Sequence, residues 1–159
     1  MNQVELMVNG ESVKISIPSN ERLLDTLRER LGLKSVKEGC GSGECGACTI
    51  ILDGNPVCSC LMRTVQADGK SITTLEGIGK DGGLHPVQKA FMDAGAIQCG
   101  FCTPGMILTT VALLKKNPTP SDEEIKEALS GNICRCTGYV KIIEAVKMAA
   151  KHMEGKVDG

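Results

Sequence analysis

The sequence predicts an α+β fold in which a small sheet domain is followed by a four-helix bundle. Apolar residues alternate with period two near the N-terminus, and they recur at helical spacing through the second half. A glycine-rich segment, GIGKDGG at 77–83, separates the two patterns. We therefore expect a sheet domain over residues 1–76, a linker over 77–83 and a helical domain over 84–159.

The first half carries the signals of a mixed sheet with one helix. Two alternating segments flank Asn9-Gly10, which is typical of a β-hairpin with a two-residue turn. Leucines at helical spacing after Asn20 predict a helix that ends near Gly32. The expected strands and extended segments are 4–8, 12–17, 47–52, 57–66 and 71–75.

The second half carries helix signals, including recognisable starts. Thr103 precedes Pro104, which suits an N-cap followed by proline at the first helical position. Ser121 and Glu124 have the spacing of a capping box. The expected helices are 86–94, 104–116, 122–130 and 139–153.

Composition and charge exclude several classes of protein. The 159 residues include 18 Lys and Arg against 19 Asp and Glu, a net charge of −1 that argues against a nucleic-acid partner. Only three aromatic residues are present, too few for a base-stacking surface. No apolar run approaches the roughly 20 residues that span a bilayer, so we expect no membrane partner. We see no export signal and expect a cytoplasmic protein.

Cysteine is the informative residue type. The chain has nine cysteines, an odd number that a fully paired disulfide framework does not explain. A reducing cytosol also disfavours structural disulfides. The cysteines fall into a first group of five and a second group of four, which suggests two four-thiolate sites and one spare thiol. The groups are Cys40, Cys45, Cys48, Cys58 and Cys60, then Cys99, Cys102, Cys134 and Cys136.

The first group has the spacing of a plant-type 2Fe–2S site. Residues 39–48 read GCGSGECGAC, so that Cys40, Cys45 and Cys48 form a C-x4-C-x2-C motif. Zinc sites more often use two C-x2-C knuckles and do not need such a glycine-dense loop. The fourth ligand is either Cys58 or Cys60, and we favour Cys60. Cys58 is then a small apolar residue or a spare thiol.

The second group supplies four thiolates from two turns. Cys99 and Cys102 form C-x2-C, whereas Cys134 and Cys136 form C-x1-C, and both turns lead into expected helices. Helix N-termini favour negative charge, and Arg135 adds a cation, so this group suits a second 2Fe–2S cluster. The alternatives are a zinc site and a catalytic dithiol at Cys99 and Cys102. The dithiol interpretation requires a βαβ context that this sequence lacks.

Together the two groups resemble one family. The motifs KEGCGSGECGACT, CSCLM, QCGFCTPGM and GNICRCTGY occur in the order found in the iron–sulfur (2Fe–2S) small subunit of the xanthine dehydrogenase family of molybdenum hydroxylases. The resemblance covers nearly the whole chain. It implies a β-grasp ferredoxin-like domain followed by a four-helix bundle that holds the second cluster. It also supports Cys60 as a ligand, whereas Cys58 departs from the usual pattern.

The resemblance further implies cofactors on partner subunits. A large subunit would bind a molybdenum–pterin cofactor, expected as the cytosine dinucleotide, and a medium subunit would bind FAD. The assembly would be a dimer of heterotrimers. By the same analogy, Gln98 and Cys136 lie at the edge of the pterin. No residue of this chain is expected to be catalytic.

The implied function is electron relay. Electrons from molybdenum would pass one at a time through the second cysteine group to the first group, and then to FAD. We expect the substrate of the complex to be a purine or a related N-heterocycle. Aldehyde- or carbon monoxide-oxidising complexes are alternatives within the family. A free-standing two-cluster ferredoxin and a zinc-stabilised interaction module are alternatives outside it.

Overall fold

One mixed sheet organises the N-terminal half of the protein. The computed structural model describes residues 1–155. Five strands lie in the order β2-β1-β5-β3-β4. β1 pairs antiparallel with β2 and parallel with β5, whereas β3 pairs antiparallel with β4 and β5. The strands are β1 Asn2–Val8, β2 Glu11–Ile17, β3 Thr49–Leu52, β4 Asn55–Cys58 and β5 Ser71–Thr73.

The predicted hairpin and the predicted first helix are both present. Asn9 and Gly10 turn the chain with positive φ angles of 51° and 87°, as a two-residue hairpin requires. The leucine-rich segment forms α1, Leu23–Asp25, and continues as a π-helical turn over Thr26–Arg30. Its buried leucines pack with the apolar side chains of β1 and β2, so the helix covers the core side of the sheet.

The expectation of an extended segment over 57–66 is wrong. β4 ends at Cys58, and two 3₁₀ turns follow, Ser59–Leu61 and Thr64–Ala67. The first turn is fixed by the buried Ser59 hydroxyl, which donates to the Cys48 carbonyl oxygen at 2.8 Å. Beyond it, the Leu23 amide donates to Met62 O and the Thr64 amide donates to Glu21 O, both at 2.9 Å, which directs the segment toward the start of α1 instead of along β3.

Four helices make up the second half. They are α2 Pro86–Asp93, α3 Thr103–Lys116, α4 Asp122–Leu129 and α5 Val140–Glu154. The capping box of Ser121 and Glu124 is confirmed, but α3 begins at Thr103 with Cys102 as its N-cap, one residue earlier than expected. α2 packs against α5 and α3, and α4 packs against α3 and α5. No helix within residues 1–155 is long and apolar enough to cross a membrane.

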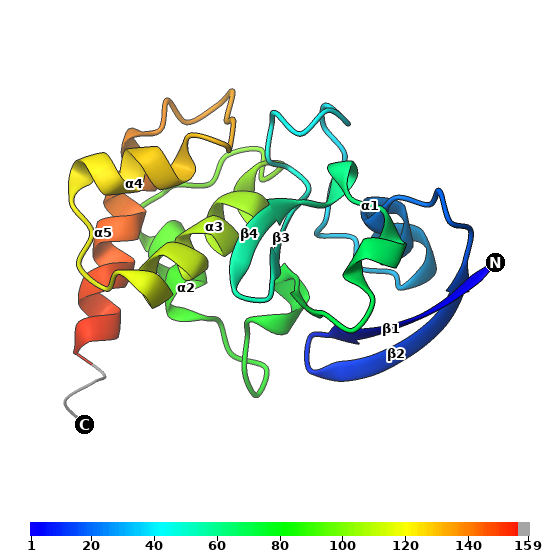
Figure 1. Cartoon of the computed structure of the whole chain (residues 1–159). Helices are drawn as coiled ribbons and strands as arrows, with labels where there is room; N and C mark the ends of the chain where they lie inside the picture. The colour runs from blue at the N-terminus through cyan, green and yellow to red at the C-terminus, as the bar shows by residue number, and fades with distance from the viewer. Residues whose placement is uncertain (156–159) are drawn as a thin grey trace.

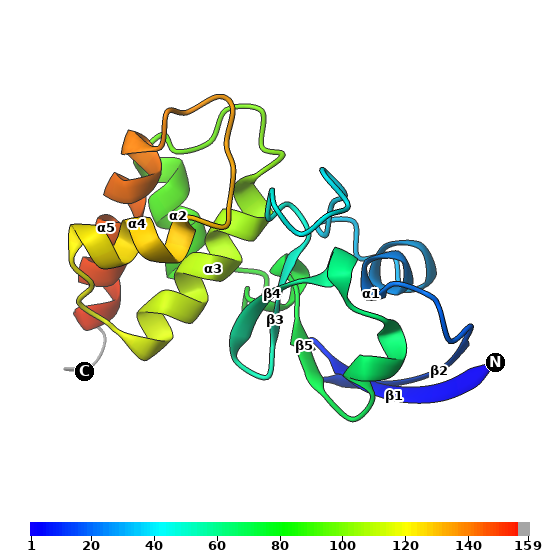
Figure 2. The same cartoon turned by 45° about the horizontal axis from the view of Figure 1, so that its top comes forward.

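Two hydrophobic cores meet at β3. Ile50 belongs to the core beneath α1, whereas Ile51 belongs to the core of the helical half. Successive side chains of a strand point to opposite faces, so β3 contributes to both cores. α3 packs against β3 and β4. Figures 1 and 2 accordingly show β3 and β4 between the helices at one end of the molecule and the β1–β2 hairpin at the other.

Candidate metal centres

The first cysteine loop directs backbone amides at sulfur. The amides of Ser42, Glu44 and Cys45 donate to Cys40 Sγ at 3.3, 3.3 and 3.4 Å. Hydrogen bonds from the Ser42 hydroxyl and from these amides lower the pKa of Cys40 to about 5. Donors of this kind stabilise an anionic sulfur ligand. The loop therefore surrounds Cys40 Sγ with donors that suit an anionic metal ligand.

Two glycines permit close contacts of the first cysteine loop, one within the loop and one with the segment before Cys134. A Cβ on Gly39 would lie 2.7 Å from Cys45 Sγ. Gly46 has a φ of +72°, and a Cβ there would lie 2.3 Å from the carbonyl oxygen of Gly131. Gly46 thus allows the first cysteine loop to touch the segment that leads to Cys134.

The surroundings of Cys58 and Cys60 differ in a way that bears on the fourth ligand. The Gly43 amide donates to the Cys60 sulfur, whereas the Cys58 thiol donates to the Gly43 carbonyl oxygen at 3.6 Å. Burial and the nearby Cys48 raise the pKa of Cys60 to about 12 and that of Cys58 to about 11. A carbonyl oxygen repels a thiolate but accepts from a thiol. The geometry therefore favours Cys60 as a metal ligand and Cys58 as a protonated thiol.

The second cysteine group is assembled from two loops. Figures 1 and 2 both place the loop before α3, which carries Cys99, beside the loop between α4 and α5. The Thr137 hydroxyl and amide donate to the buried Cys134 Sγ at 3.1 and 3.4 Å. Burial opposes ionisation of Cys134, but these bonds outweigh it and lower the pKa of the thiol. Burial and the adjacent Cys134 raise the pKa of Cys102 to about 12.

Most of the candidate ligand cysteines lie beside one other cysteine. Within residues 1–155, no three His, Cys, Asp or Glu side chains are grouped as they are around a single metal ion. In a 2Fe–2S cluster each iron takes two thiolates, and pairs of thiols fit that requirement. Bound iron would also offset the burial that keeps several of these thiols protonated. Side-chain contacts join Cys99 with Cys136, Cys102 with Cys134, and Cys48 with both Cys60 and Cys58. Cys40 and Cys45 are linked differently, because the backbone amide of each donates to the sulfur of the other at 3.4 Å.

A direct hydrogen bond joins the two cysteine groups. The Ile133 amide donates to the Cys45 carbonyl oxygen at 2.9 Å, and the residue after Ile133 is Cys134. Beside this bond lies Asn132, which is only 5% exposed. Its amide nitrogen donates to Gly46 O at 3.2 Å and to Thr49 Oγ1 at 3.3 Å. The Thr109 hydroxyl donates to its amide oxygen at 2.9 Å, so Asn132 bonds both halves of the protein.

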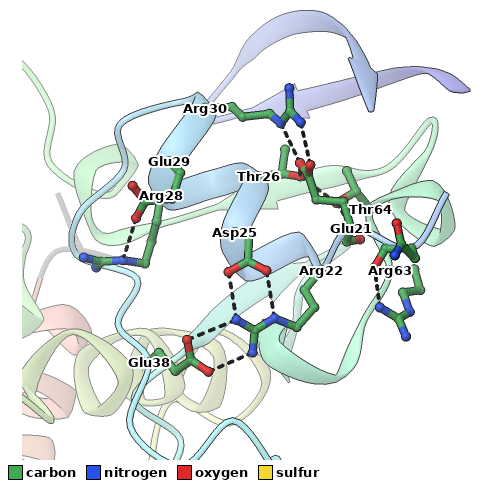
Figure 3. Close-up of polar contacts among 11 residues, drawn as sticks. Glu21, Arg22, Asp25, Thr26, Arg28, Glu29, Arg30, Glu38, Arg63 and Thr64 are labelled. Carbon is green, nitrogen blue, oxygen red and sulfur yellow. Dashed lines mark hydrogen bonds and ion pairs between the residues drawn. The ribbon is translucent and has the colours of Figure 1, made fainter. Parts of the chain in front are cut away.

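An ion-pair network anchors the segment before the first loop. The Arg22 guanidinium donates to both carboxylate oxygens of Asp25, each at 2.8 Å, and to those of Glu38 at 2.8 and 3.0 Å (Figure 3). Hydrogen bonds from Arg22 hold the pKa of Glu38 below its ordinary value. Glu38 lies two residues before Cys40, so the network ties α1 to the start of the cysteine loop. The cysteine pattern did not reveal this anchor.

The two residues predicted at the pterin edge, Gln98 and Cys136, are exposed. Arg135, predicted as a cation near the second group, is exposed as well. The sequence reasoning assigned no role to Tyr139, yet its hydroxyl accepts a hydrogen bond from the Cys134 amide at 2.9 Å. Tyr139 has a φ of +69°, and its position directly after the CRCTG motif was the available signal.

Two families of 2Fe–2S domains match the ranges that contain the two cysteine groups. The family described as "2Fe-2S iron-sulfur cluster binding domain" matches residues 6–75, and that described as "[2Fe-2S] binding domain" matches residues 74–147. The nicotinate dehydrogenase small FeS subunit of Eubacterium barkeri is 58% identical over 93% of this chain and 94% of its own length. The xanthine dehydrogenase iron-sulfur-binding subunit of Escherichia coli O157:H7 is 47% identical over 90% of this chain and 91% of its own length.

The fold recurs in a solved structure. The aldehyde oxidoreductase of Desulfovibrio desulfuricans superimposes with a TM-score of 0.94 and 47% identity over 98% of this chain. The match covers 18% of that larger chain. The arrangement described above is therefore found both as a separate subunit and as part of a longer polypeptide.

Proposed function

Because the chain belongs to the iron–sulfur (2Fe–2S) small subunits of the xanthine dehydrogenase family of molybdenum hydroxylases, we propose that it relays single electrons from a molybdenum–pterin centre to FAD. The chain is an electron-transfer component of an oxidoreductase, and relatives named as small subunits imply larger partner subunits. We assign the molybdenum–pterin, as its cytosine dinucleotide, to a large subunit and FAD to a medium subunit. We further propose a cytoplasmic dimer of heterotrimers.

The paired thiols define how this chain would hold its clusters. Each pair would bind one iron, and each bound 2Fe–2S cluster accepts one electron at a time. The first cluster would be held by Cys40, Cys45, Cys48 and Cys60, and the second by Cys99, Cys102, Cys134 and Cys136. We regard residues 1–76 as a β-grasp ferredoxin-like domain, 77–83 as a linker and 84–159 as a four-helix bundle domain, of which 156–159 lie outside the described residues.

One observation carries the relay proposal: the backbone hydrogen bond from the Ile133 amide to the Cys45 carbonyl oxygen. Cys45 is a proposed ligand of the first cluster, and Ile133 is bonded to Cys134, a proposed ligand of the second. The two sites are thus joined by a short chain of covalent bonds and one hydrogen bond. An enzyme that removes two electrons from a substrate needs such a path, because each cluster carries only one.

The exposed rim of the second site suits contact with the molybdenum subunit. Gln98 and Cys136 are both exposed there. A glutamine amide both donates and accepts hydrogen bonds, as a pterin edge requires. We therefore place the pterin edge against Gln98 and Cys136. Electrons would enter at the second cluster and leave from the first.

An N-heterocycle is the proposed substrate class of the whole complex. The relative named as a nicotinate dehydrogenase subunit is 58% identical, and the one named as a xanthine dehydrogenase subunit is 47% identical. Both names refer to N-heterocyclic substrates. The structure named as an aldehyde oxidoreductase is also 47% identical, so aldehyde oxidation is the competing assignment and carbon monoxide oxidation a third.

Metal analysis and electron paramagnetic resonance test the proposal. The anaerobically purified chain should contain about four iron ions and show two distinct 2Fe–2S signals after reduction with dithionite. About two zinc ions and a colourless protein would instead indicate a structural zinc module. Purification from the native host should yield two larger chains with this one. A chain that elutes alone with both clusters would indicate a free-standing ferredoxin.

A further inference from the structure

Lys37 precedes the first cysteine loop in the sequence, but its side chain contacts the loop between Cys99 and Cys102. It lies three residues before Cys40, and its amide donates to the Ala47 carbonyl oxygen at 3.2 Å. Its ammonium nitrogen nevertheless donates to Gly100 O at 3.5 Å and lies 5.5 Å from the centroid of the Phe101 ring. Gly100 and Phe101 are the two residues between Cys99 and Cys102. The sheet half therefore supplies a cation to the loop that would hold the cluster of the helical half.

The ammonium is held by an oxygen dipole and an aromatic ring rather than by a carboxylate. Partial burial and the nearby Arg28 lower the pKa of Lys37, whereas Cys102, Cys99 and Glu76 oppose that shift. An oxidised cluster with four thiolates carries a formal charge of about −2, which would further favour the ammonium form. Within residues 1–155 no carboxylate forms an ion pair with Lys37, although Glu76 lies near enough to favour its charge, so the field of the ammonium still acts on its surroundings.

We propose that Lys37 raises the reduction potential of the cluster held by Cys99, Cys102, Cys134 and Cys136, and so eases entry of the electron into the relay. Reduction adds one negative charge to the cluster. A fixed cation in a partly buried position stabilises the reduced form more than the oxidised form, since the attraction grows with the charge. The inference rests on the proposed function, because it requires a 2Fe–2S cluster at this site.

A redox titration of the full chain, followed by electron paramagnetic resonance, tests this role. Lys37→Met keeps the length of the side chain but removes its charge, whereas Lys37→Arg keeps the charge. We expect Lys37→Met to lower the equilibrium constant for one-electron reduction of the second cluster about tenfold. This corresponds to a reduction potential about 59 mV lower. Lys37→Arg should retain most of the potential, and the potential of the first cluster should move less in both variants.

Two further variants complete the design. Cys102→Ser should remove one of the two signals and thereby assign it to the second cluster. Lys89→Met removes a charge elsewhere in the helical half, from an exposed pair with Asp93 at 2.7 Å, and should leave both potentials unchanged. If Lys37→Met does not fold, Lys37→Gln is measured in its place.

The proposal is overturned if the neutral variant leaves the second potential unchanged. It is also overturned if both clusters shift equally, or if the arginine variant shifts as far as the methionine variant. Failure of the proposed function would look different: the unmodified chain would show no 2Fe–2S signal, or it would elute from the native host with both clusters but without larger partner chains.

Discussion

Replacing Asn132 by alanine should weaken the junction between the two halves of the protein. The substitution leaves the hydroxyl of Thr109, which is 4% exposed, without its acceptor. The Gly46 carbonyl oxygen would stay bonded, because the amide and hydroxyl of Thr49 donate to it at 3.1 and 2.7 Å. One orphaned hydroxyl costs about 1–3 kcal/mol, and the two lost bonds from the amide cost about 0.5–1.5 kcal/mol each. Allowing for relaxation, we expect a loss of about 3 kcal/mol.

Thermal unfolding of the cluster-loaded chain measures this loss. For a chain of this size, each kcal/mol shifts the Tm by about 2–4 °C, so Asn132→Ala should unfold roughly 6–12 °C lower. Asn55→Ala is the matched control, because Asn55 also links the halves, through a 2.6 Å bond from Lys116, but is exposed. The control should lose less than about 1 kcal/mol. Equal shifts in the two variants, or a Tm of Asn132→Ala within about 2 °C of the parent, would refute the reasoning.

The remaining predictions concern the packing of the loops, the fourth ligand and acid stability. Gly105→Ala would place a Cβ 2.3 Å from the backbone of the first cysteine loop and should lower the Tm, whereas Gly131→Ala, with open space around it, should not. Cys60→Ser should eliminate the first 2Fe–2S signal while Cys58→Ser keeps it; the opposite result would exchange the two assignments. Burial disfavours the Glu76 carboxylate, but hydrogen bonds from neighbouring groups outweigh it and lower the pKa. The Glu76 carboxylate therefore stabilises the fold fully above the ordinary pKa of glutamate, and this contribution is lost as the pH falls through the lower pKa of the folded state. Glu76→Gln should consequently make the Tm fall less steeply with pH on the acid side. An unchanged dependence of Tm on pH there would contradict this.

Local patterns predicted most of the elements because those elements depend on local interactions. The Asn9-Gly10 turn and the Ser121 capping box each involve residues within a few positions of one another. The segment after Cys58 was predicted wrongly for the opposite reason. Its 3₁₀ turns depend on bonds to distant groups, including the bond from the Thr64 amide to Glu21 O at 2.9 Å. Alternation of residue types does not report such partners.

The candidate metal centres likewise have local features, which the sequence predicts, and long-range contacts, which it does not. Cysteine spacing indicates which thiols belong to each group, since the spacing reflects how a loop wraps around a cluster. The contacts that join the groups are separated by many residues: Lys37 from Gly100 by 63, and Asn132 from Gly46 by 86. One sequence without a structure offers no signal for pairs so far apart. The roles of Lys37 and Asn132 therefore emerge only from the fold.

The division of Ile50 and Ile51 between two cores has a consequence for truncation. A cut in the 77–83 segment would remove the Ile51 side chain from the core of the helical fragment. It would also leave Ile51 exposed on an apolar surface of the sheet fragment. Each fragment produced by itself should therefore be prone to aggregate, although two binding domains can be recognised along the chain. Mixing the separately made fragments should restore solubility, because each would supply the surface that the other lacks.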